Sequence, residues 1–192
     1  DLGLGFEIPV HPGISTVTFL FTVVAILGLV NAFNLIDGLD GLASGLAIIS
    51  LAGVGLGAFA SGHGAHALTV AILIAPVSVF WLSNMGWFGA SRKTFLGDSG
   101  ATLLGFLVAV CLIQASQPGA AVIDPVFVLW CVAVPVVDTL QVMWNRVRAG
   151  DSIFDSDRRH MHYQLVDVGY SKAQSVTLML SANIMVIGVG FL

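Results

Sequence analysis

Long apolar runs constrain the fold of this chain more than any other feature of its sequence. A helix needs about 20 consecutive, mostly apolar residues to cross the roughly 30 Å of hydrocarbon in a bilayer. Six runs of about that length follow one another, near residues 14–33, 42–60, 66–83, 100–117, 124–144 and 173–192. Only 9% of the 192 residues are charged, far below the usual quarter, and the mean hydropathy is +0.95. The chain is therefore predicted to be a membrane protein.

The same runs predict helices rather than the strands of a β-barrel. Every backbone N–H and C=O group in lipid must be hydrogen-bonded, either within a helix or in a closed barrel. The runs lack the alternation of apolar and polar residues that barrel strands show. In the second run, Gly53 and Gly57 have the spacing that lets helices approach closely. We expect an all-α fold, a polytopic bundle of about six transmembrane helices.

The chain shows no change of composition that would separate a second domain. We expect one membrane domain over residues 1–192, whose longest polar stretch is 145–172. Because the chain starts at Asp1 rather than Met and ends inside an apolar run at Leu192, we also expect it to be a fragment of a longer protein.

The positions of the basic residues predict which loops face the cytoplasm. All seven Lys and Arg residues lie in the polar segments 84–99 and 145–172, and the turns at 61–65 and 118–123 have none. Lys and Arg accumulate in cytoplasmic loops, so the two basic segments should be cytoplasmic. Six alternating crossings then place 34–41 on the same side. Three polar segments that are far apart in the sequence are thus predicted to meet at one membrane surface.

The first of these segments carries amide and carboxyl side chains at a regular spacing. In the run NAFNLIDGLDG, Asn31, Asn34, Asp37 and Asp40 recur every three residues, which at a helix end places them on nearly one face. Asp40 could instead cap the following helix, because Asp and Asn are favoured caps. A cap needs only one such residue, so four in register at a membrane surface indicate a ligand site.

The second segment is FLGDSG, residues 95–100, just before the fourth apolar run. By itself it is equally explained by Asp98 or Ser99 acting as a helix cap. Together with the acidic run, however, it would bring carboxylates from two helix ends to one place. Such carboxylates could hold one Mg²⁺, with Mn²⁺ as the alternative, because hard cations prefer oxygen ligands and keep waters and substrate phosphates.

The third segment, DRRHMH at 157–162, combines guanidinium groups with two imidazoles. Arg is well shaped to bind phosphate oxygens in pairs. A solvated basic loop that follows the charge rule is the alternative interpretation, and His160 and His162 alone make a poor zinc signature. With a net charge of −4 and its basic residues confined to one side, the sequence shows no pattern for nucleic-acid binding.

These three motifs, in this order and separated by apolar runs, resemble the polyprenyl-phosphate N-acetylhexosamine-1-phosphate transferases of glycosyltransferase family 4. Within that family they are most similar to the bacterial enzymes that act on undecaprenyl phosphate and UDP-N-acetylglucosamine. The resemblance runs from Asn31–Leu42 through Phe95–Gly105 to Pro135, Asp138 and the loop 157–162. Two features depart from the family pattern: Tyr163 stands where a further His is common, and the upstream pair of adjacent aspartates is absent from this chain.

The resemblance implies an enzyme that transfers N-acetylglucosamine-1-phosphate, or a related sugar phosphate, from a UDP-sugar to undecaprenyl phosphate. UMP would be released, and the product would start a lipid-linked glycan of the cell envelope. The resemblance further implies a multi-pass protein of the bacterial inner membrane, with its site facing the cytoplasm and Mg²⁺ as its cofactor. A homodimer is left open.

The resemblance also assigns roles to individual residues. It implies Mg²⁺ ligation by Asp98 and Asn34, and catalysis or nucleotide contact by Asp37 and Asp40. Stacking of Phe95 on uracil is one interpretation of that residue, and a plain interfacial anchor is an equal one. Apart from the resemblance, Asp138 is expected to be structural, with support of a site residue as the alternative, and Arg146 is too far along the helix to be assumed as its partner. The substrate-binding residues implied are Asn34, Asn84, Phe95, Arg158, His160 and His162.

Two other functions remain as alternatives at this point. An intramembrane aspartyl protease also brings carboxylates together from neighbouring helices, but Gly would be expected where this chain has Phe95. A transporter for Mg²⁺ or an anion would line a pathway with polar helix ends at mid-membrane depth. The polar clusters of this chain are predicted to lie at one surface instead.

Overall fold

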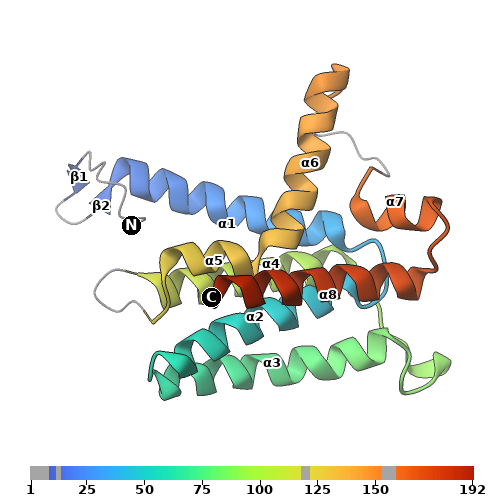
Figure 1. Ribbon diagram of the computed structural model, residues 1–192, viewed down its shortest axis with the longest axis horizontal. Coiled ribbons are helices and arrows are strands. Elements are labelled where there is room, and N and C mark those ends of the chain that lie inside the picture. Colours follow the sequence, from blue (N-terminus) through green and yellow to red (C-terminus); the bar gives the residue numbers. More distant parts are fainter. Residues whose placement is uncertain (1–8, 12–13, 118–121, 153–158) are drawn as a thin grey trace.

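The computed structural model describes residues 9–11, 14–117, 122–152 and 159–192. Within these ranges the chain is helical, apart from a short antiparallel pair of strands, β1 (Pro9–His11) and β2 (Ile14–Ser15), ahead of the first helix. Figure 1 shows long helices lying side by side as a bundle, with one helix, α6, pointing away from it. The predicted all-α fold is confirmed.

In the described part of the chain, five helices are long and apolar enough to cross a membrane by length and composition, or six if the bent pair Pro125–Cys131 and Ala133–Ala149 counts as one span. The five are α1 (Thr16–Ile36), α2 (Leu42–Ala60), α3 (Gly64–Asn84), α4 (Gly97–Ser116) and α8 (Lys172–Gly190). The shorter elements are η1 (Ala90–Arg92), α5 (Pro125–Cys131), α6 (Ala133–Ala149) and α7 (Met161–Asp167). This is the architecture of a multi-pass membrane protein.

Helix α2 lies at the centre of the bundle and contacts α3, α4, α5 and α8. Small residues let its neighbours approach closely, as the sequence predicts. A Cβ added at Gly53 would come within 3.0 Å of Cys131 Sγ, and one at Gly57 within 2.8 Å of a side-chain carbon of Ile123. Alanine at either position would force these neighbouring side chains to shift.

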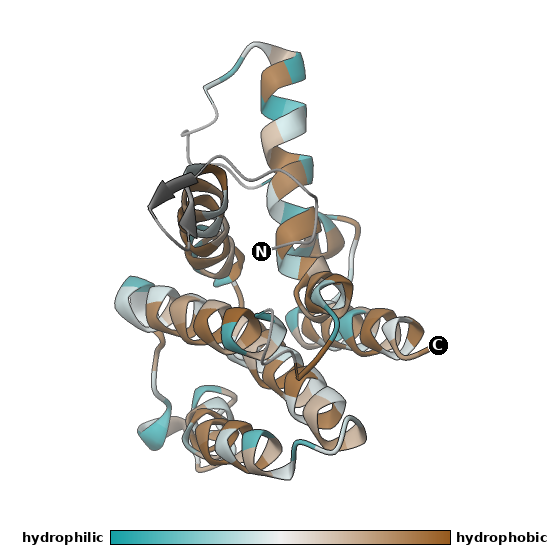
Figure 2. Ribbon diagram, turned by 90° about the vertical axis from the view of Figure 1, so that its left-hand side faces the viewer, coloured by the Kyte–Doolittle hydropathy of each residue, from teal (hydrophilic) through white to brown (hydrophobic). Residues whose placement is uncertain are grey.

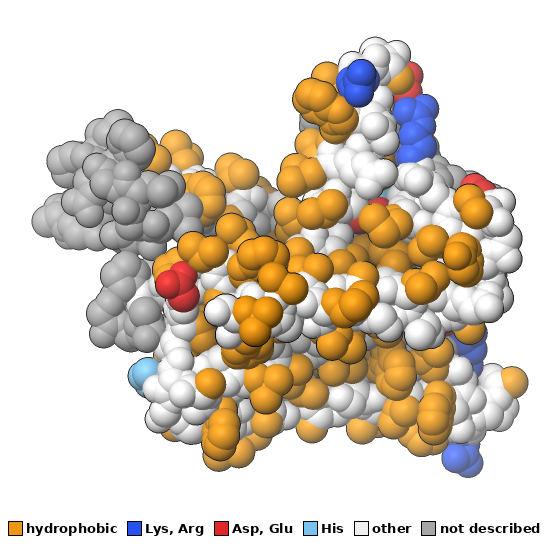
Figure 3. Space-filling model, in the orientation of Figure 1, with side chains coloured by type: hydrophobic (Ala, Val, Ile, Leu, Met, Phe, Trp, Pro, Cys, Tyr) orange, Lys and Arg blue, Asp and Glu red, His pale blue; other side chains and the backbone are white. Residues whose placement is uncertain are grey.

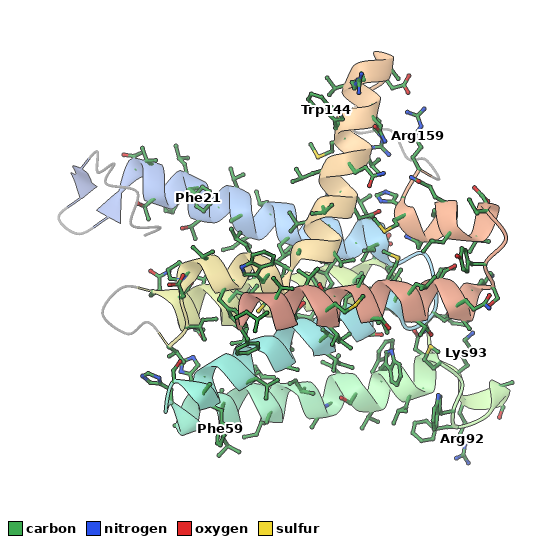
Figure 4. The ribbon with its side chains drawn as sticks, in the orientation of Figure 1. Phe21, Phe59, Arg92, Lys93, Trp144 and Arg159 are labelled. Carbon is green, nitrogen blue, oxygen red and sulfur yellow. The ribbon has the colours of Figure 1, made fainter. Side chains whose placement is uncertain are left out.

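The outer faces of the bundle are apolar, as expected for surfaces that meet lipid. Figure 2 shows apolar residues on most faces of the bundled helices, whereas polar and apolar residues alternate along α6. Figure 3 shows hydrophobic side chains over the long sides of the bundle and Lys and Arg side chains at its right-hand end and along α6. Phe21 and Phe59, labelled in Figure 4, are 50% and 72% exposed on these outer faces.

The predicted span at 124–144 is not one straight helix. Helix α5 ends at Cys131, α6 begins at Ala133, and the two axes differ by 74°. Pro135 explains the break, because proline has no N–H to donate to the carbonyl of Cys131 four residues earlier. That carbonyl instead accepts hydrogen bonds from Ser50 Oγ at 2.7 Å and Asn183 Nδ2 at 3.4 Å.

The three polar segments come together at one end of the bundle, as predicted. The turn between α1 and α2, the loop between α3 and α4, and helix α7 all lie at the right-hand end in Figure 1. The strands β1 and β2 and the turn between α2 and α3 lie at the other end. The alternation of helix direction therefore produces the juxtaposition that the distribution of basic residues indicated.

The carbonyl at the break gives a first prediction. Ser50→Ala should lower the stability of the protein by about 1–3 kcal/mol, because it removes the shorter hydrogen bond to a buried carbonyl. Thermal unfolding in detergent measures the effect. Thr177→Ala is the control, since that exposed hydroxyl bonds only to Ala173 of its own helix. Equal unfolding temperatures for the two variants would contradict this account of the break.

Candidate functional site

The acidic turn follows directly from the end of α1. Asn34 lies in the last turn of that helix, and the backbone then turns at residues 37–41 before α2 begins at Leu42. Gly41 has φ +79°, a left-handed conformation that favours glycine. A Cβ on Gly41 would also overlap the sulfur of Met85. The second glycine of the DGLDG run is therefore required for both conformation and space.

Asn84 fixes this turn to the loop that follows α3. Its side chain is buried, its Oδ1 accepts the backbone N–H of Gly41 at 2.5 Å, and its Nδ2 donates to the carbonyl of Thr94 at 2.8 Å. Trp81 Nε1 also donates to the carbonyl of Gly41, at 3.0 Å. Asn84 thus aligns two of the polar segments, a structural role that the sequence did not reveal. Its contact with substrate stays a prediction.

The structure brings Asp98 next to the acidic turn. Asn34 Nδ2 lies 3.4 Å from Asp98 Oδ1, across 64 residues of sequence. Neither of the capping interpretations describes these carboxylates: α2 begins after Gly41 and α4 after Leu96, and neither start has a side-chain cap. Asp98 is exposed in the first turn of α4, where the helix dipole favours negative charge.

Negative charge accumulates where these residues meet. The pKa of Asp37 is raised to about 6, first by burial and then by repulsion from the carboxylates of Asp40 and Asp98. Lys93 Nζ offsets part of this charge, since it lies 2.5 Å from Asp40 Oδ2. The same ammonium group is 5.7 Å from the centre of the Phe95 ring, which is itself 77% exposed. This role of Lys93 was not predicted from the sequence.

The oxygen donors of this cluster fit a hard divalent cation. Asp98 and the Asn34 amide are in contact, and the repulsion felt by Asp37 is the kind that a cation relieves. No group of three His, Cys, Asp or Glu side chains in the described part of the chain is arranged to hold a metal. A cation here would therefore complete its shell with water or with substrate phosphates, as Mg²⁺ commonly does.

One of the two histidines, His162, lies against the acidic turn. His162 is fully buried, and its ring lies so close to Gly38 that a Cβ there would overlap Nε2. Its ring is stacked on that of His160, with centroids 5.8 Å apart and planes 14° apart. Tyr163, at the position where the family commonly has His, packs on His162 with centroids 4.1 Å apart.

Burial controls the charge of His162. It lowers the pKa of this imidazole to about 4, opposed in part by Asp138 and assisted by His160. Neither ring nitrogen has a hydrogen-bond partner among the residues that the structure describes. His162 is therefore a neutral, buried imidazole packed against Gly38 of the acidic turn.

The predicted arginine contact can be placed only in part. Arg158 and Asp157 lie outside the described residues. Arg159 forms an ion pair with Asp151, with 2.7 Å between Nη2 and Oδ2. Figure 4 shows Arg159 beside α7 and Lys93 on the α3–α4 loop, at the same end of the bundle.

The sequence did not predict the hydrogen-bond partner of Asp138. Its side chain is 1% exposed, and its Oδ2 lies 2.7 Å from His160 Nδ1. A lone carboxylate in an apolar helix signals that some partner must exist. The identity of that partner depends on how α6 leaves the bundle, which the linear sequence does not specify.

The fold and this site define a multi-pass membrane protein with carboxylates, amides and imidazoles gathered at one end of its helical bundle. A family model described as Glycosyl transferase family 4 matches residues 4–116, which include the acidic turn and Asp98. The chain belongs to glycosyl transferase family 4.

Three similar bacterial proteins carry the name undecaprenyl-phosphate alpha-N-acetylglucosaminyl 1-phosphate transferase. The protein of Yersinia pestis is 36% identical over 172 residues, which cover 90% of this chain and 47% of the relative. The protein of Escherichia coli K12 is 34% identical over 174 residues, or 91% and 47% of the two chains. That of Haemophilus influenzae is 33% identical over 149 residues, or 77% and 42%. The chain spans about half the length of the curated relatives it matches.

The contact between Gly38 and His162 yields a second prediction. Gly38→Ala should displace α7 from the acidic turn, because the new methyl group has no room beside the imidazole. Hydrogen exchange of the amides in 161–167 should become faster. The matched control is Gly28→Ala on α1, where a Cβ meets nothing within 4 Å. Unchanged exchange in Gly38→Ala would show that the close contact is absent.

A third prediction concerns pH. The unfolded chain protonates His162 near the ordinary pKa of 6.5, whereas the folded protein does so only near 4. Between pH 6.5 and 4, the unfolded state therefore binds more protons at this residue than the folded state does. The contribution of neutral His162 to folding stability is fully present above pH 6.5 and is lost as the pH falls towards 4. His162→Gln should lose less stability than the wild type between these pH values in thermal unfolding. Parallel pH curves for the two proteins would contradict the depressed pKa.

Proposed function

We propose that the protein containing this chain transfers N-acetylglucosamine-1-phosphate, or a related sugar phosphate, from its UDP derivative to undecaprenyl phosphate. The name of the relatives supports the lipid acceptor and the transferred group. The observation that carries the proposal is the meeting of the acidic turn, Asp98 and the histidine pair at one end of the bundle.

The proposed reaction exchanges one phosphoanhydride bond for another. A phosphate oxygen of the lipid attacks the β-phosphorus of the UDP-sugar and forms a new P–O bond. The bond from the β-phosphorus to the bridging oxygen breaks, and UMP leaves with that oxygen and its electron pair. The lipid then carries the sugar through a diphosphate.

Mg²⁺ is the proposed cofactor, with Mn²⁺ as the alternative, and Asp98 and Asn34 would hold it. Rotation of the Asn34 amide would exchange its nitrogen for its oxygen at the position that now faces Asp98. When bound, the cation would neutralise phosphate charge and stabilise charge that develops during transfer. It would also relieve the repulsion that the carboxylates exert on one another.

The remaining residues would bind substrate and move protons. Asp37 and Asp40 are the proposed catalytic carboxylates, and the raised pKa of Asp37 brings its proton exchange closer to neutral pH. Phe95 presents an exposed ring on which uracil could stack. His160 and His162, together with Arg158 outside the described residues, would contact the diphosphate or sugar, and Asn84 would hold the two loops in register.

We further propose that this end of the bundle faces the cytoplasm of a bacterial inner membrane. The basic residues of the described part of the chain lie at this end or on α6, which agrees with the positive-inside rule. A nucleotide sugar could then reach the site from the cytoplasm, while the lipid phosphate reaches it from the bilayer. Membership of the family leaves the protease and transporter alternatives without a supporting observation.

The full-length protein in detergent tests the reaction. Given polyprenyl phosphate, Mg²⁺ and each of a panel of UDP-sugars, it should produce UMP and a lipid-linked sugar diphosphate, most efficiently from UDP-N-acetylglucosamine. Release of UMP that does not exceed a control without lipid, for every sugar in the panel, would refute the proposal.

A fourth prediction tests the cation ligand. Asp98→Asn in the full-length protein should lower kcat on the order of 10²-fold or more and weaken Mn²⁺ binding measured by electron paramagnetic resonance. Asp151→Asn is the control, because that carboxylate pairs with Arg159 near the same end. Normal turnover and Mn²⁺ binding in Asp98→Asn would exclude the proposed ligand.

A further inference from the structure

The carboxylate of Asp138 has both of its oxygens bonded to the segment that begins α7. Oδ2 lies 2.7 Å from His160 Nδ1, and Oδ1 accepts the backbone N–H of Met161 at 2.7 Å. Both side chains of the pair are buried, with 1% exposure for Asp138 and 3% for His160. A single carboxylate on α6 therefore fixes the histidine ring and the start of the helix behind it.

If the Asp138–His160 pair served only to join two helices, it would do so at a high cost in desolvation free energy. A buried carboxylate must be removed from water, and a well-packed apolar pair of similar volume commonly stabilises a protein as much or more. The two short hydrogen bonds instead orient their donor groups, because an ionised carboxylate only accepts hydrogen bonds. The hydrogen between Asp138 and His160 must therefore be on Nδ1.

Fixing the hydrogen on Nδ1 determines what the other ring nitrogen can do. In the neutral ring Nε2 is then an acceptor with an unshared electron pair, and in the charged ring it is a donor. No hydrogen bond of Nε2 is found among the described residues. The carboxylate thus leaves that nitrogen for a ligand.

The orientation of His160 matters because of what lies beside it. Its ring is stacked on His162, whose own ring lies against Gly38 of the acidic turn. The bond from Asp138 to Met161 holds the first residue of α7, the helix that carries His162. Asp138 therefore controls the placement of both imidazoles relative to the carboxylate cluster, although it lies on a different helix.

We propose that Asp138 is a positioning residue, whose carboxylate holds His160 in the Nδ1–H tautomer and presents Nε2 to the diphosphate of the substrate. This inference rests on the proposed sugar-phosphate transfer for its substrate. The geometry of the pair, by contrast, is independent of that function and has its own readout.

Asp138→Asn is the informative substitution, since it keeps the size of the side chain. The amide offers one acceptor oxygen and one donor group, but the two hydrogen bonds of Asp138 both come from donors. When the amide oxygen accepts from Met161, its NH₂ group faces Nδ1 and favours the Nε2–H tautomer. In the full-length protein, kcat should fall between about 10²- and 10⁴-fold with little change in KM.

The control variants separate positioning from simple stability. Thr139→Val changes the next residue, whose hydroxyl bonds to Pro135 of its own helix and not to the histidine, so it should keep kcat. In a His160→Gln background, adding Asp138→Asn should cause little further loss, because a residue that acts through another loses its effect when the other is gone. An equal additional loss in that background would overturn the proposal, as would normal kcat in Asp138→Asn.

Nitrogen NMR of protein labelled with ¹⁵N-histidine gives a readout that does not require activity. In the wild type, His160 should show its hydrogen on Nδ1, and in Asp138→Asn it should shift to Nε2. A wild-type ring with hydrogen on Nε2 alone would overturn the proposal even if the variant does not fold. If the wild type releases no UMP, the proposed function fails while the tautomer still decides the positioning role.

Discussion

The site depends on one backbone carbonyl that proline leaves without its usual partner. Inside a bilayer such a group must be bonded by other parts of the protein. Ser50 from α2 and Asn183 from α8 bond the carbonyl of Cys131, so the chain can turn by 74° between α5 and α6. The turn directs α6 out of the bundle and brings Asp138 to His160. A helix continuing straight from α5 would point its carboxylate elsewhere.

Repulsion between carboxylates is the second constraint on the site. Burial raises the pKa of Asp37, and the nearby carboxylates of Asp40 and Asp98 raise it further, although Lys93 offsets part of the charge. Hydrogen bonds of Asn84 and Trp81 with the backbone of Gly41 hold the turn in place and offset this repulsion. Because the ligand-free chain holds these carboxylates together despite their repulsion, a bound cation would stabilise the site, and so would hydrogen-bond donors that accompany a substrate.

The sequence predicted the helical fold and the meeting of the three polar segments, but it did not predict several of the contacts that hold the site together. The distribution of Lys and Arg placed the acidic turn, Asp98 and the histidines together, because it depends only on the order and number of crossings. The bridge made by Asn84 was missed, since a polar residue at a helix end is equally compatible with binding substrate. The break at Val132 was missed because an apolar run reads as continuous even where Pro135 interrupts its hydrogen bonds.

The sequence by itself determined that this chain forms apolar helices across a membrane and carries the motifs of its family. Those properties depend on residues that are close together in the sequence, so they can be predicted without knowing the tertiary structure. Only the tertiary structure decided that Asp138 bonds to His160, 22 residues later, and that Asn34 meets Asp98, 64 residues later. Such partners depend on the direction and rotation of whole helices, which are set by packing across the bundle and not by local composition.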